Sequence, residues 1–146
     1  MNKPIAIIIH CSATPVFRDF SLMDIDRMHR NRGFASVGYH YYITKDGVVH
    51  QGRPINQVGA HCIGWNDQSI GICYEGGLNT ALKSEDTRTS FQKSALTSLI
   101  RDLITKYPLI TKIYPHSKFA NKDCPCFDAE KEYSYLLKYK SDGLLK

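Results

Sequence analysis

Hydrophobic residues gather in short runs that predict strands. The run from Pro4 to Cys11 is short and rich in isoleucine, which predicts a buried strand. Residues 69–77 form a second apolar run, and residues 111–115 form a shorter third one. Aromatic and β-branched residues flank an Asp-Gly pair between residues 38 and 54. This arrangement is typical of a β-hairpin whose turn lies at the Asp-Gly pair.

Other segments repeat apolar residues at helical spacing. Ser21 begins a variant of the capping box, and Gly33 is placed to end the helix that follows. A longer amphipathic helix is expected from near Phe91 to just before Pro108, and a last helix near Asp128. The shared face of the first helix holds Leu22, Ile25, Met28 and His29. That of the longer helix holds Phe91, Ala95, Leu96, Leu99, Leu103 and Ile104.

The order of these segments predicts the fold class. Strands and helices alternate, but the hairpin requires an antiparallel pair, so we expect an α/β (α+β) fold with a central mixed sheet covered by helices. The 146 residues contain no repeat, low-complexity segment or linker, which predicts a single domain over residues 1–146. Sites in such sheets form at strand ends. His10 ends a predicted strand, His116 follows one and Tyr39 begins one.

Composition narrows the class of protein. Hydrophobic residues make up 42% and charged residues 23%, as in ordinary globular proteins. The net charge of +5 favours an anionic partner, and the lack of a long Lys/Arg run gives no reason to expect nucleic acid. The first apolar run is too short for a signal peptide, and no stretch approaches the about 18 apolar residues of a membrane span. We therefore expect cytoplasmic synthesis without a signal peptide or a transmembrane segment.

Histidine and cysteine suggest a metal site. The five cysteines are an odd, scattered set, which favours reduced thiols over a disulfide framework. His10, His116 and Cys124 come from distant segments and would give zinc two nitrogens, one sulfur and an open position. Spacing alone leaves two alternatives open. His10 and Cys124 could be buried structural residues, or a Cys–His pair could serve nucleophilic catalysis.

Four blocks carry a family resemblance. They are IIHCSAT, VGYHYYITKDGVVHQGR, GAHCIGWNDQSIGICYEGG and KDCPCFD. Their order and spacing over about residues 5 to 130 resemble the N-acetylmuramoyl-L-alanine amidase family, which includes peptidoglycan recognition proteins and amidase-type phage lysozymes. The resemblance implies zinc-dependent cleavage of the amide bond between N-acetylmuramic acid and L-alanine in peptidoglycan. It also implies one Zn²⁺ per chain and an endolysin that acts on the cell wall after release.

The resemblance assigns roles position by position. It implies that His10, His116 and Cys124 bind zinc and that Tyr39 and Lys122 are catalytic. Read without the family, Tyr39 would be a hairpin aromatic packing on its neighbours. Lys122 would likewise be a solvated loop charge.

Further residues are expected to contact the substrate. They are His61, Trp65 and Asn66 in the glycine-rich segment before the second strand run. A structural role for His61 and a packing role for Trp65 are the alternatives.

Two departures favour the phage-lysozyme branch of the family. Position 73 is a cysteine where some bacterial amidases have a glutamate base, and the third ligand is Cys124 where some members have aspartate. Two other functions stay open. One is a non-catalytic peptidoglycan-binding recognition protein, a group usually marked by loss of the ligand cysteine. The other is a regulator that binds RNA polymerase, a partner raised by the resemblance alone.

Overall fold

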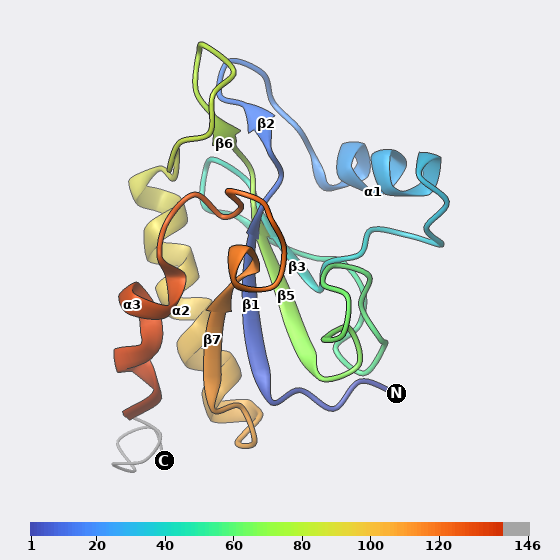
Figure 1. Cartoon of the computed structure of the whole chain (residues 1–146), viewed down its shortest axis with the longest axis vertical. Helices are drawn as coiled ribbons and strands as arrows, with labels where there is room; N and C mark the ends of the chain where they lie inside the picture. The colour runs from blue at the N-terminus through green and yellow to red at the C-terminus, as the bar shows by residue number, and fades with distance from the viewer. Residues whose placement is uncertain (139–146) are drawn as a thin grey trace.

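The computed structural model describes residues 1–138 and is built around a five-stranded sheet (Figure 1). The strand order is β4-β3-β5-β1-β7. The central strand β1 (Ala6–Cys11) pairs in parallel with β5 (Ser69–Tyr74) and with β7 (Lys112–Pro115). Next to β5, β3 (Tyr41–Ile43) runs parallel to it and antiparallel to β4 (Val49–Gln51). The predicted hairpin and the predicted mixed sheet are both confirmed.

Both faces of the sheet are covered, so every residue of β1 and β5 is buried. Helices α2 (Ser90–Lys106) and α3 (Ala129–Tyr133) pack on one face, where they share a core with isoleucines of β1 and β5. A smaller core beside α1 (Leu22–Asn31) covers the other side of β3 and β5. Figure 1 shows α2 and α3 on the β7 side and α1 on the opposite side.

The helix ends follow from capping. The Ser21 hydroxyl accepts the N–H of Asp24, whose carboxylate accepts the N–H of Ser21, so the predicted capping box is present. Gly33 follows the helix with φ +95°, a conformation that glycine adopts without strain. The predicted face of α2 was wrong at Phe91, whose side chain is 67% exposed. The buried stripe of α2 instead runs through Gln92, Leu96, Ile100, Leu103 and Ile104.

Several short elements were not predicted from the sequence. The strands β2 (Thr14–Pro15) and β6 (Gly77–Leu78) form a two-stranded parallel sheet. Two 3-10 turns, η1 (His116–Lys118) and η2 (Ser134–Leu136), follow β7 and α3. Residues 139–146 of the expected single domain lie outside the described part of the chain. Among residues 1–138, no helix has the length and apolar character to cross a membrane.

Candidate active site

The carboxyl ends of β1 and β7 bring the predicted metal ligands together. His10 is near the end of β1, and His116 opens η1 directly after β7. Because the two strands are neighbouring and parallel, these ends meet at one edge of the sheet. Cys124 reaches the same point from the loop before α3. One donor atom from each of the three residues lies within 4.8 Å of the others, so the group could hold a metal ion.

Backbone contacts place the Cys124 sulfur. The N–H of Cys11 points at Cys124 Sγ at 3.1 Å, and such a donor stabilises negative charge on a thiolate. The carbonyl of Cys124 accepts the N–H of Ser117, which ties the loop to η1. One residue on, the Pro125 carbonyl accepts the buried hydroxyl of Tyr74 at 2.7 Å. The loop is thus fastened to β1, β5 and η1, and these contacts direct the sulfur toward the two histidines.

The two histidines predicted to be ligands have lowered pKa values and are neutral at pH 7. Burial, reinforced by His61 and His116, holds the pKa of His10 well below its usual 6.5. Burial and the nearby Lys122 also lower the pKa of His116. A neutral imidazole keeps a free lone pair for a metal. Two neutral imidazoles and one thiolate form a donor set that suits zinc.

Tyr39 and Lys122 lie at the same place but differ in exposure. The Tyr39 ring centroid is 5.0 Å from that of His10. Burial and the neighbouring Cys73 raise the pKa of the Tyr39 hydroxyl well above 10, so it remains a proton donor at neutral pH. Lys122 is exposed, and within residues 1–138 its ammonium has no ion pair. Its charge is therefore free to meet an incoming group.

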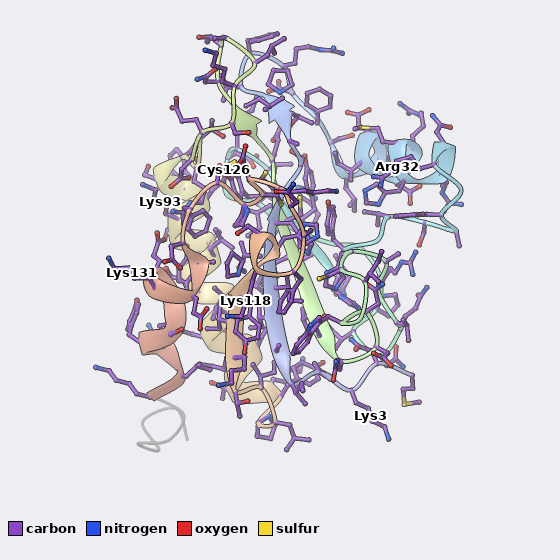
Figure 2. The ribbon with its side chains drawn as sticks, in the orientation of Figure 1. Lys3, Arg32, Lys93, Lys118, Cys126 and Lys131 are labelled. Carbon is purple, nitrogen blue, oxygen red and sulfur yellow. The ribbon has the colours of Figure 1, made fainter. Side chains whose placement is uncertain are left out.

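These residues open onto a cavity of about 460 Å³. Its lining combines basic groups with apolar ones such as Phe34 and Ile63, and the described lining residues include no Asp or Glu. Arg32, which follows the last residue of α1 and is labelled in Figure 2, is one of the lining residues. The cavity therefore favours an anionic ligand. The positively charged lining residues are Arg32 and Lys122, whereas burial lowers the pKa values of the lining histidines His10, His29, His61 and His116.

Of the three residues predicted to contact the substrate, two line the cavity and one does not. His61 and Asn66 both line the cavity. Asn66 Oδ1 accepts the backbone N–H groups of His61 and Cys62, so this amide also shapes the loop. Trp65 is not among the lining residues. Its ring packs with Phe119 and Tyr114, at centroid distances of 5.1 and 5.8 Å, which is the packing role named as its alternative.

Sequence reasoning missed His29 as a cavity residue. It is 6% exposed, lines the cavity, and its Nδ1 accepts the N–H of Gly38 at 2.8 Å. Burial, with Arg32 and Arg53 nearby, lowers the pKa of His29 to about 4. The signal was its spacing four residues after Ile25, which puts both on the buried face of α1.

Comparison with known proteins identifies the family. The family model "N-acetylmuramoyl-L-alanine amidase" matches residues 1–127. The chain belongs to this family. The endolysins of Enterobacteria phage K11 and Escherichia phage T7 are each 37% identical to it. The alignments cover 84% and 86% of this chain and 81% and 83% of those endolysins.

Solved structures of other amidases share the fold. The endolysin amidase LysCS of Clostridium intestinale superposes with a TM-score of 0.78 at 32% identity, over 99% of this chain and 86% of that one. A Drosophila peptidoglycan recognition protein, PGRP-LB, gives 0.74 at 25% identity over 90% of this chain and 80% of its own. Family, fold class and enzyme class are those that the sequence resemblance implied.

Proposed function

We propose that this amidase is an endolysin that hydrolyses the amide bond between N-acetylmuramic acid and L-alanine in peptidoglycan with one bound Zn²⁺. The observation that carries the proposal is the convergence of His10, His116 and Cys124, of which the two histidines also line a cavity. Relatives that are 37% identical over most of their length are phage endolysins. After release from the cell interior, the enzyme would act on the cell wall.

The donor set fits zinc better than a hard cation. Zinc takes imidazole nitrogen and thiolate sulfur, whereas Mg²⁺ and Ca²⁺ prefer oxygen ligands. The Cys11 N–H at Cys124 Sγ and the neutral histidines prepare the three ligands before any ion arrives. When bound, zinc would supply Lewis acidity and a water whose pKa is lowered to about 7.

Two side chains of the cavity would stabilise the negative charge that develops during the reaction. Attack on the amide carbon leaves negative charge on the carbonyl oxygen, and donors aimed at that charge lower the barrier. We assign this role to the Lys122 ammonium and to the Tyr39 hydroxyl. The Tyr39 hydroxyl can also relay a proton to the leaving amine. Burial raises the thiol pKa of Cys73, which takes the position where the resemblance implies a glutamate base in some bacterial amidases.

The electrostatics of the cavity fit the stem peptide. Stem peptides carry carboxylates, and the cavity presents the positive charges of Lys122 and Arg32 without a described acidic residue. Peptidoglycan is therefore the proposed partner. The comparisons give no support to the polymerase-binding alternative, and we do not propose it.

A non-catalytic recognition protein remains the second candidate. A Drosophila recognition protein, SC2, is 35% identical over 107 residues. Cys124 nevertheless completes the ligand group, and this favours catalysis. Metal content separates the two candidates. Elemental analysis of protein purified without added metal should give close to one zinc per chain, whereas a zinc-free chain with full amidase activity would contradict the mechanism.

A further inference from the structure

We infer that His61 is a positioning residue that fixes His10 as the tautomer protonated at Nε2 and so leaves His10 Nδ1 for the metal. A buried chain of close contacts carries the inference. His10 Nε2 lies 2.8 Å from His61 Nδ1, and His61 Nε2 lies 3.3 Å from Ser69 Oγ. Ser69 Oγ in turn lies 2.6 Å from the Trp65 carbonyl oxygen. The part of the inference that concerns a metal rests on the proposed function.

The direction of every hydrogen bond follows from the last acceptor. The Trp65 carbonyl can only accept, so the Ser69 hydroxyl donates its single proton there. Ser69 Oγ must then accept from His61, which puts the His61 proton on Nε2. A neutral imidazole with its proton on Nε2 has a bare Nδ1 that can only accept. His10 therefore donates from its own Nε2, and its Nδ1 keeps a lone pair.

Packing holds the His61 ring in this orientation. The residue is 9% exposed and its ring lies in a slot beside two glycines. A Cβ built on Gly71 would fall 2.6 Å from the ring, and one built on Gly59 would fall equally close. The backbone N–H of His61 is bound by Asn66 Oδ1 at 2.8 Å. The ring can neither rotate freely nor move away from His10.

The last acceptor in this series of hydrogen bonds, the Trp65 carbonyl, is also held in place. Trp65, whose carbonyl is the final acceptor, packs against Tyr114 and Phe119. Tyr114 belongs to β7, the strand that leads into His116. Although Trp65 does not line the cavity, its packing on Tyr114 and Phe119 holds its carbonyl in place to accept the Ser69 hydroxyl. The same aromatic group supports the acceptor of the Ser69 hydroxyl and packs beside the segment that carries a second ligand.

Such an outer hydrogen bond orients a metal-binding imidazole and increases its basicity, and its loss typically lowers metal affinity by about 10- to 100-fold. Two variants separate the hydrogen bond from the packing. His61→Leu fills the slot without an acceptor. His61→Asn places an amide oxygen near the position of Nδ1 and keeps the acceptor. We expect His61→Leu to lose roughly 10- to 100-fold in zinc affinity, measured by competition with a chelator, while His61→Asn stays near the wild-type value.

A second readout does not depend on metal. In the metal-free wild-type chain with ¹⁵N-labelled histidine, NMR should show the His10 proton on Nε2. Ser69→Ala tests the same series of hydrogen bonds if His61→Leu does not fold. In this variant His61 loses its Nε2 acceptor, so the preference of the His10 proton for Nε2 should weaken. A proton on His10 Nδ1 in the wild type would overturn the inference, as would equal zinc loss in both His61 variants. Absence of zinc binding by the wild type would instead refute the proposed function and leave the tautomer result standing.

Discussion

Cys124 and Cys126 are separated by one proline, yet their thiols have different surroundings. Cys124 Sγ groups with the nitrogens of His10 and His116. The backbone at Cys126 is left-handed, with φ +73°, and its thiol lies 4.0 Å from Cys11 Sγ and 3.5 Å from the Gly77 carbonyl. Figure 2 labels Cys126 on this loop. The structure thus makes Cys126 a natural control for Cys124.

Cys124→Ser should loosen or remove the metal and abolish hydrolysis, because a serine hydroxyl stays protonated at neutral pH and binds zinc poorly. Binding to peptidoglycan should survive, since Cys124 belongs to neither hydrophobic core and is not among the residues that line the cavity. Cys126→Ser should keep activity, because a hydroxyl can still donate to the Gly77 carbonyl. Amidase activity and peptidoglycan pull-down of both variants measure this. Loss of activity in Cys126→Ser alone would show that the ligand is assigned two residues too early.

Lys122→Ala should lower turnover by roughly 10²- to 10³-fold, the range for loss of one oxyanion donor. Zinc content should not change, because Lys122 is not a ligand. Lys118→Ala is the matched control, since Lys118 pairs with Glu130 and does not line the cavity. Steady-state rates on peptidoglycan test both variants. Equal rates for Lys122→Ala and wild type would make Lys122 an ordinary solvated charge.

Residue types could be predicted better than their surroundings. His10 and His116 could be nominated because each sits at a predicted strand end, Cys124 because it could supply a sulfur ligand, and the resemblance then assigned all three to zinc. The hydrogen bond between His10 and His61 could not be foreseen, and helical spacing placed His29 on the shared face of α1 without indicating that it lines the cavity. Both depend on how loops and α1 pack against the sheet, which no local pattern encodes.

At the scale of elements, His29 connects α1 to the segment that leads into β3. Its Nδ1 accepts the N–H of Gly38, and its ring lies 5.1 Å from Phe34 and 5.2 Å from Tyr39, centroid to centroid. A proton on Nδ1 would break the hydrogen bond to Gly38. This is consistent with a pKa of about 4 that results mainly from burial.

The free energy of unfolding should therefore fall as the pH drops from about 6.5 to about 4. Unfolded His29 takes up a proton near pH 6.5, and folded His29 only near pH 4. Between these values the unfolded state binds more protons, so stability rises with pH by up to about 1.4 kcal/mol per pH unit for this residue. His29→Asn keeps an acceptor near the Nδ1 position without titrating. Urea unfolding of metal-free protein should show a shallower pH slope for this variant, and an unchanged slope would contradict the assignment.

The main elements were predictable because their signals are local. Isoleucine-rich runs gave β1 and β5, the Asp-Gly turn gave the β3–β4 hairpin, and capping residues placed the start of α1. The two-residue strands β2 and β6 carry no pattern of their own and form because the ends of β1 and β5 run side by side. The exposure of Phe91 was missed because the α2 face was assigned from hydrophobicity, while buried Gln92 instead donates to the carbonyls of Ile43 and Glu75.

At the scale of the molecule, strand order makes the site. With β1 between β5 and β7, His10 is flanked by His61 near β5 and by His116 after β7. Local sequence patterns could not predict this strand order, because the order pairs segments that are distant in the chain. The strand order brings together His10, His116 and Cys124, the three predicted zinc ligands, beside a cavity that the two histidines line.

A digest of purified peptidoglycan, read by mass spectrometry with and without a chelator, tests the central claim most directly. The account predicts free stem peptides that begin with L-alanine and glycan strands that keep an intact lactyl group. The chelator should stop their release, and added zinc should restore it. Cleavage at glycosidic or peptide–peptide bonds, or amide cleavage that continues in the chelator at the full rate, would contradict the account.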